Sequence, residues 1–328
     1  MKKVVLSALA ALMLSAAPAF AADVPVKAKK VVAAPAPSPW DIAFGAAVMN
    51  DYVFRGVTQS NHKFSVAGYV EPRFNINPDL QLYAGIAAES IKFPNGATAE
   101  VDFYAGIRPT FGPLALDFGF WYYYYPGGNC FNTGTPAGAF GADCAANGFL
   151  ANGNAIKKDL SFWELYAKAT YTAGDWAFGP TFYYSPSFLN SGAPGEYLSL
   201  IVKFTAPANM AIAKEIGWYV SGEFGRQWLG TSDSFYGLLN TAGGPGIDYA
   251  DYNTWNIGIG FTWKQLTLDL RYSDTDLSQA NCNAFTSDHT AAFNGSFSTI
   301  NPSGVGSKWC GATFIAKLSV DFTASSFR

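Results

Sequence analysis

Charged and apolar side chains alternate in several stretches of about ten residues in this 328-residue chain. Glu71 and Arg73 fall on one side of an extended strand, whereas Val70 and Phe74 fall on the other. Charged groups that share one face could line a water-filled channel, where rings of charge select small solutes. The side chains predicted to point inward in this way are Glu71, Arg73, Glu89, Asp102, Arg108, Asp117, Glu164, Lys168, Lys203, Glu223, Asp269, Arg271, Lys317 and Asp321.

The same charged set has a second interpretation. Its acids outnumber its bases by eight to six, so most members could pair with an opposite charge on a neighbouring strand. Such pairs would block the bore instead of lining it, and the protein would then be a structural barrel without conduction. The sequence leaves the open pore and the filled interior as alternatives.

Enzymatic chemistry is not indicated. The two histidines, His62 and His289, both fall in predicted loops, and no serine–histidine–acid spacing connects them. No glycine-rich phosphate-binding motif is present, and the cysteine spacings do not resemble a zinc site. The sequence therefore predicts no catalytic residue, cofactor or metal.

The four cysteines fall in two long gaps between strands. Cys130 and Cys144 lie in one gap, and Cys282 and Cys310 bracket another. Four cysteines allow three pairings, and their locality favours Cys130–Cys144 and Cys282–Cys310. Each disulfide would staple one external loop, which an oxidising compartment permits.

Twelve alternating stretches must position these side chains. A sheet with lipid on one face and water on the other produces this pattern, and it must close into a barrel because unpaired backbone groups in hydrocarbon are costly. The competing fold, a soluble β-sandwich, does not explain why every second gap is long. The predicted strands are 41–55, 63–75, 79–91, 100–110, 114–125, 159–172, 176–186, 196–206, 215–228, 251–263, 266–273 and 309–322.

The fold predicted is an antiparallel transmembrane β-barrel of about 12 strands. Ten or fourteen strands stay open as alternatives because the segment 207–214 is weakly patterned. An even count places both termini in the periplasm, with the long loops outside and the short turns inside. The loops after the strands 114–125 and 266–273 could either fold inward as a constriction or lie outside as stapled caps.

The first residues are typical of an export signal. Lys2 and Lys3 precede a short apolar run, and Ala19-Phe20-Ala21 has the form of a cleavage site. The alternative, a short membrane anchor, is disfavoured by the length of the run. The domain prediction is a signal peptide at 1–21, an Ala/Pro/Lys-rich periplasmic tether at 22–39 and an outer-membrane barrel at 40–328. Without the signal the net charge is about −5, which gives no electrostatic basis for nucleic-acid binding.

One motif resembles a known family. The segment Asn50 to Ser60, which reads NDYVFRGVTQS, and the strand that follows are similar to the N-terminal part of the TorF-family putative porins of proteobacteria. The mature start Ala22 to Ala28 is similar to outer-membrane proteins of rhizobial-type bacteria. The likeness covers about a fifth of the mature chain and implies an outer-membrane barrel assigned as a porin, with no substrate implied.

If the alternation of the first strand continues into the motif, it predicts which side chains of the motif point outward and which point inward. Tyr52 and Phe54 continue the outward face and suit an outer aromatic girdle, while Asp51 and Arg55 point inward near the mouth. Arg55 would then contribute to the pore entrance, or the motif would merely shape a turn and a rim. Gly56 permits the turn.

Partners follow from the predicted location. The sequence predicts a Gram-negative outer-membrane porin for passive diffusion of small hydrophilic solutes, in contact with outer-membrane lipid and inserted by the barrel assembly machinery. That machinery commonly reads a terminal aromatic residue, whereas here Phe322 is followed by six more residues. The alternative function is a non-conducting structural or surface-interaction barrel with disulfide-stapled loops. Oligomeric state is not indicated.

Overall fold

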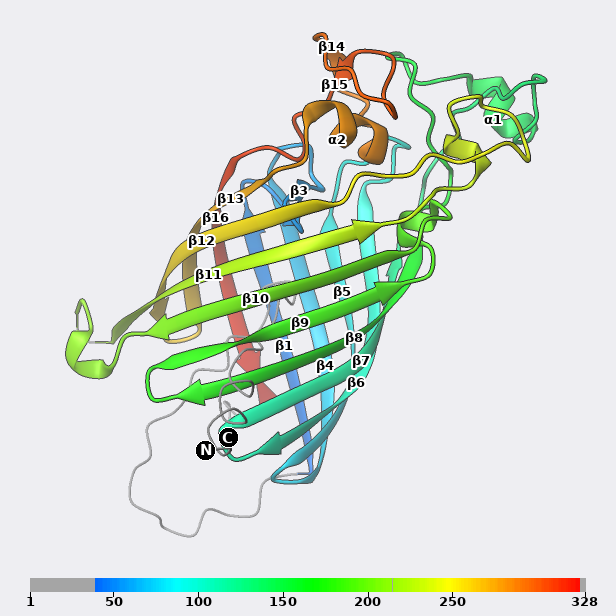
Figure 1. Ribbon diagram of the computed structural model, residues 1–328. Coiled ribbons are helices and arrows are strands. Elements are labelled where there is room, and N and C mark those ends of the chain that lie inside the picture. Colours follow the sequence, from blue (N-terminus) through cyan, green and yellow to red (C-terminus); the bar gives the residue numbers. More distant parts are fainter. Residues whose placement is uncertain (1–38, 214, 325–328) are drawn as a thin grey trace, which may run out of the picture.

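Twelve antiparallel strands form one closed barrel (Figure 1). The computed structural model describes residues 39–213 and 215–324. Each strand pairs with the next along the chain, and the first and last strands close the cylinder. The strands are β1 Trp40–Met49, β4 Ser65–Asn77, β5 Leu80–Ser90, β6 Ala99–Phe111, β7 Leu114–Tyr124, β8 Phe162–Ala173, β9 Trp176–Ser185, β10 Gly195–Thr205, β11 Ile216–Leu229, β12 Tyr252–Trp263, β13 Leu266–Thr275 and β16 Thr313–Thr323.

This architecture confirms the predicted barrel and its count of twelve strands. The weakly patterned segment after β10 is a short connection that contains the 3-10 helix η2, Ala208–Met210, and β11 follows it directly. The predicted signal peptide and the tether up to residue 38 lie outside the described residues. Among the described residues, no helix has the length and apolar character needed to cross a membrane.

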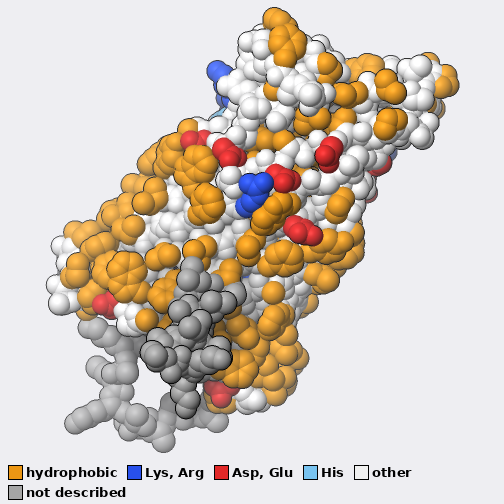
Figure 2. Space-filling view, in the orientation of Figure 1, with side chains coloured by type: hydrophobic (Ala, Val, Ile, Leu, Met, Phe, Trp, Pro, Cys, Tyr) orange, Lys and Arg blue, Asp and Glu red, His pale blue; other side chains and the backbone are white. Residues whose placement is uncertain are grey.

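The two faces of the wall differ as the alternation predicts. In β4, Ser65, Glu71 and Arg73 are buried, whereas Val66 and Val70 are exposed on the outside. Hydrophobic side chains cover much of the outer wall in Figure 2, and the charged ones on this face gather toward the end with the loops. Large apolar side chains exposed on the wall include Ile42, Leu82, Ile86, Phe103, Phe118, Phe120, Leu165, Leu198, Val202, Phe224, Ile257, Phe314 and Leu318.

Tyrosine rings cover glycines on the inner face. A Cβ added at Gly85 would lie 2.3 Å from the Tyr104 ring, and one at Gly119 would lie 2.4 Å from the Tyr166 hydroxyl. The missing side chain thus lets a large ring lie flat against the neighbouring strand. This arrangement fills part of the bore with phenol groups.

The long connections gather at one end of the barrel, and the short turns lie at the other (Figure 1). The connection after β7 contains α1, Ala142–Asn147, and the connection after β13 contains α2, Gln279–Thr286, with the short pair β14, Ala292–Phe293, and β15, Val305–Gly306. Cys130–Cys144 and Cys282–Cys310 are both disulfide-bonded, which confirms the predicted pairing.

These two connections form stapled caps and not an inward constriction. They contact each other through Asn154, whose amide donates to Asn283 Oδ1 at 2.8 Å. The first connection, between β1 and β4, is the one that folds into the bore, and it was not among the loops predicted to do so. It contains the short strands β2, Val53–Phe54, and β3, Val57–Thr58.

Two strand boundaries were predicted wrongly for related reasons. The first strand ends at Met49 and not at Arg55, because the Asn50 side chain takes over the pairing with β16. Its amide donates to the Phe314 carbonyl at 2.8 Å and accepts from the Ala316 amide at 2.6 Å, after which the backbone turns inward. The last strand begins at Thr313 because Trp309 and Cys310 belong to the cap.

Candidate functional site

A two-residue hairpin places Arg55 inside the barrel. Val53 and Phe54 pair with Thr58 and Val57, and Arg55-Gly56 forms the turn with φ values of 47° and 78°. Two successive positive φ angles are typical of a type I′ turn. A Cβ at Gly56 would lie 2.2 Å from Thr275 Cγ2, so glycine is required both by the turn and by the contact with β13.

Asp51 holds the base of this hairpin. Its carboxylate accepts hydrogen bonds from Thr58 Oγ1 at 2.5 Å, Ser60 Oγ at 3.0 Å and Thr313 Oγ1 at 3.1 Å. His62 Nδ1 lies 2.7 Å from Oδ2, the carboxylate oxygen that Thr313 also bonds. The polar residues of the motif therefore fix the hairpin to itself and to β16.

His62 is thus a structural partner of Asp51 and not a merely solvated loop histidine. The hydrogen bond to the Asp51 carboxylate raises the pKa of His62 above its usual value, against the opposing effect of burial. Its Nε2 atom faces the Lys308 carbonyl at 3.2 Å. Ser60 bonds the carboxylate and not the imidazole, so these residues do not have the order of a catalytic triad.

The Arg55 guanidinium reaches across the bore to β8. Its two terminal nitrogens lie 2.9 and 2.7 Å from the Glu164 carboxylate oxygens, and Nη1 also donates to Gln227 Oε1 at 3.1 Å. Arg55 is 9% exposed and Glu164 is 0% exposed. Burial lowers the pKa of Arg55, but the Glu164 carboxylate more than offsets this and raises it overall.

Aromatic rings enclose this ion pair. The guanidinium carbon lies 4.5 Å from the centre of the Tyr197 ring, 4.6 Å from Phe54 and 4.7 Å from Tyr183. Cation–π contacts of this kind strengthen when water is excluded. Arg55, Glu164 and these rings together lie in the bore below the caps; we call this group the Arg55 closure.

A second charged group lies nearer the short turns. Glu71 accepts from Arg73 Nε at 2.6 Å and from Arg108 Nη1 at 2.7 Å, and Arg108 Nε donates to Asp117 at 3.2 Å. These side chains line a cavity of about 370 Å³. Its lining also includes the side chains of Lys168, Gln81, Asn75, Asn77, Asp79, Thr110 and Thr170.

A third group follows β10 to β13. Arg271 donates to Asp269 at 3.0 Å, to Ser221 Oγ at 2.8 Å and to Asn256 Oδ1 at 2.5 Å. Asn256 in turn donates to Glu223 at 2.9 Å. Lys203 lies over the Tyr219 ring, with Nζ 4.1 Å from its centre. This wall of the bore is held by hydrogen bonds between neighbouring strands.

The predicted inward residues lie on the inner face in these groups. Asp102 lies apart from them, beside Glu89 and Glu100, and Lys317 pairs in register with Asp269 while Asp321 accepts from the Tyr69 hydroxyl. Their role toward a permeating solute stays a prediction. Sequence reasoning missed Gln227 and Glu100, although both fall on the inward parity of their strands.

Tyr52 and Phe54 were placed wrongly, because the chain leaves the wall at Asn50. Arg55 points inward as predicted, and its partners Glu164 and Gln227 lie close to the loop ends of β8 and β11. Tyr52 is buried and its hydroxyl donates to Glu100 Oε1 at 2.7 Å, so it does not belong to an outer girdle. Phe54 packs edge-on against Tyr123 inside the barrel.

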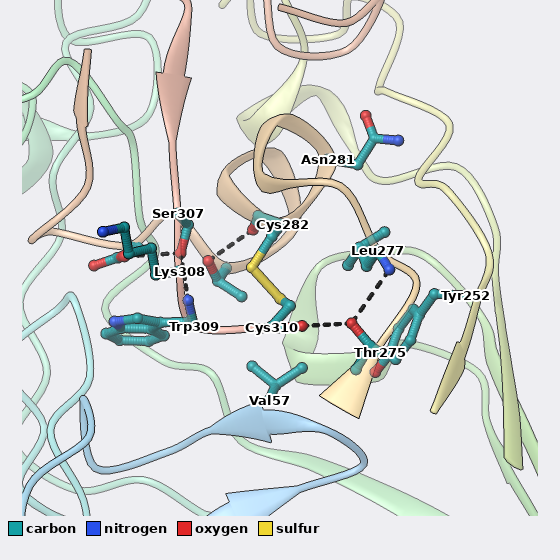
Figure 3. The surroundings of a disulfide bond; sticks show 12 residues. Val57, Tyr252, Thr275, Leu277, Asn281, Cys282, Ser307, Lys308, Trp309 and Cys310 are labelled. Atoms are coloured by element: carbon teal, nitrogen blue, oxygen red, sulfur yellow. Dashed lines mark hydrogen bonds between the residues drawn. A yellow bond between two sulfur atoms is a disulfide. The ribbon is translucent and has the colours of Figure 1, made fainter. Parts of the chain in front are cut away.

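The Cys282–Cys310 cap lies directly on the hairpin. Figure 3 shows Val57 beneath Cys310, and the Cys310 carbonyl accepts from Thr275 Oγ1 at 2.5 Å. The Thr58 amide donates to the Trp309 carbonyl at 3.0 Å, and the Trp309 indole donates to Asn61 at 3.1 Å. The hairpin is therefore clamped between this cap and the Arg55 closure.

One family model matches the part of the chain that contains the hairpin motif. The family described as "Bacterial protein of unknown function (Gcw_chp)" has a model that matches residues 33–143, about a third of the chain. This match includes the motif 50–60 and the strands from β1 to β7. No curated protein matches the chain. The resemblance to TorF-family porins therefore stays a prediction.

Several solved barrels are similar at low identity. The NanC porin is 6% identical over 86% of this chain and 98% of its own, with a TM-score of 0.39. LpxR from Salmonella typhimurium is 8% identical over 85% and 99%, with a TM-score of 0.38. OmpT of Vibrio cholerae is 10% identical over 86% and 97%, with a TM-score of 0.35. Such values are too low to support an inference about function.

Proposed function

We propose that this protein is an outer-membrane barrel that conducts small hydrophilic solutes through a narrow bore, and that the Arg55 closure is its gate. The membrane location is supported by the apolar outer wall, since a soluble monomer rarely exposes so large an apolar surface. It is also supported by the closed sheet, which leaves no unpaired edge to face lipid.

The observation that carries the proposal is the position of the hairpin above a polar cavity. The cavity beside the short turns has charged walls and a volume of about 370 Å³. The Arg55 closure lies between it and the caps, and its arginine and Phe54 are contributed by a loop, not by the barrel wall. A loop can move while the wall stays intact, so displacement of one hairpin would connect the two ends of the bore.

Planar-bilayer recording tests this gate. We expect wild type to give small, brief conductance steps, and Arg55→Ala to give steps several-fold larger and longer. Arg226→Ala is the matched control because its side chain pairs with Asp251 near the loop end, outside the bore. It should behave as wild type. Absence of steps in every variant, including one with residues 53–58 replaced by a glycine–serine linker, would contradict the channel.

A second candidate is a non-conducting barrel that presents the stapled caps to a partner. It is supported by the filled interior, where Glu164, Gln227 and Tyr197 are almost completely shielded from water. Under this alternative the ion pairs are architectural. Absence of conductance steps in the glycine–serine linker variant would favour this alternative.

A further inference from the structure

Three buried carboxylates meet at the loop end of β5 and β6. Glu89 lies directly opposite Glu100 in the β5–β6 ladder, and Asp102 is two residues farther along the same face of β6. One carboxylate oxygen from each residue lies within 4.8 Å of the others. The three residues are 1–2% exposed.

This arrangement is unfavourable unless something compensates its charge. Like charges directly opposite in a ladder repel each other, and burial makes the repulsion stronger. Among residues 39–213 and 215–324, no ion pair includes any of the three. Lys317 on β16 acts electrostatically on Glu89, but it supplies one positive charge against three negative ones.

The unused acceptors point to a ligand. Both oxygens of Glu89 and Oδ1 of Asp102 have no hydrogen-bond partner, although they are buried. Buried polar atoms are nearly always satisfied, so three orphaned oxygens in one place require an explanation. Elsewhere in the bore, Glu71, Glu164 and Asp269 each accept from an arginine.

We propose that Glu89, Glu100 and Asp102 bind one hard divalent cation, and that Ca²⁺ is the ion that fits best. Ca²⁺ takes six to eight oxygen ligands at about 2.3–2.6 Å in flexible geometry. Three carboxylates offer up to six oxygens without nitrogen or sulfur. Tyr52 donates to Glu100 and comes from the first connection, so the bound ion would also stabilise the base of the hairpin.

Terbium luminescence tests the site, because Tb³⁺ replaces Ca²⁺ and is excited by nearby aromatic rings such as Tyr52. The full chain is freed of metal with EDTA and refolded into detergent with increasing Tb³⁺, which avoids slow entry into a buried site. We expect emission that saturates at one equivalent and is displaced by Ca²⁺ more readily than by Mg²⁺. Glu89→Gln/Asp102→Asn should weaken Tb³⁺ binding at least tenfold, whereas Glu223→Gln, another interior carboxylate, should not.

A second measurement separates binding from folding. Ca²⁺ should raise the thermal midpoint of wild type but leave that of Glu89→Gln/Asp102→Asn unchanged. Without metal, the variant should have a higher thermal midpoint than wild type because the repulsion between the buried carboxylates is removed. Emission that does not saturate, or that is equal in wild type and variant, would overturn the site and indicate that a shared proton compensates the cluster. Stronger displacement by Mg²⁺ would overturn the assignment to Ca²⁺.

Discussion

Arg55 and Glu164 are 109 positions apart in the chain and form a two-pronged ion pair in the interior of the barrel. The arginine comes from a hairpin in the first connection, and the glutamate comes from the wall strand β8. A loop is thereby fixed to the opposite wall by charge, not only by packing.

Removing one member of this pair should destabilise the barrel strongly. Glu164→Leu or Arg55→Met alone leaves an uncompensated buried charge, and we expect each to lower the free energy of unfolding by about 3–5 kcal/mol. Arg55→Met/Glu164→Leu should recover most of the loss because no charge is then left alone. Urea unfolding in detergent measures the cycle, and additive effects of the single and double variants would contradict direct coupling.

The two histidines should give opposite pH dependences of stability. Asp51 raises the pKa of His62, so its contribution is complete below the unfolded pKa of about 6.5 and is lost as pH rises through the higher folded value. Burial lowers the pKa of His289, so its neutral form is favoured and stability is lost as pH falls below about 6.5. Thermal midpoints are measured as a function of pH on both sides of about 6.5. Above this pH, the midpoint of His62→Gln should fall less with rising pH than that of wild type. Below it, the midpoint of His289→Asn should fall less with falling pH. Unchanged profiles in both variants would refute these assignments.

The face assignment can be tested on β8 alone. Leu165 is exposed on the outer wall, and Lys168 lies inside between the Tyr166 and Tyr183 rings. Leu165→Arg should cost roughly 2–4 kcal/mol if it lies near the bilayer midplane. Lys168→Gln should cost clearly less, since the inner face already accommodates polar groups. Folding into lipid vesicles, followed by urea titration, compares the two; equal costs would contradict the assigned faces.

The Cys282–Cys310 disulfide should restrain the gate. Cys282→Ser/Cys310→Ser opens a 28-residue crosslink, and we expect a stability loss of about 3–4 kcal/mol in the entropy model. Because this cap contacts Val57 and Thr58, the variant should also enlarge single-channel steps. Cys130→Ser/Cys144→Ser is the control, since its disulfide lies away from the hairpin. Equal effects of both pairs on conductance would show that the cap does not restrain it.

The sequence predicts the strands of the barrel wall better than the course of the loop inside the bore. Period-two alternation reflects an apolar outer face and a polar inner face, so strands such as β4 and β7 could be predicted from their residues. The first connection was not readable because Tyr52 and Phe54 continue the outward parity of β1 beyond its true end. Only the pairing of Asn50 with β16, a contact 264 residues away, shows that the chain leaves the wall there. The Glu89–Glu100 pairing likewise depends on register, which one strand cannot reveal.

The seat of Gly56 lies against Thr254 and Thr275, near the C-terminal end of the barrel. The first loop of the chain therefore depends for its place on β12 and β13, two of the last strands. Without these strands Gly56 would have no surface to rest against, so the beginning and the end of the chain complete the mouth of the barrel together.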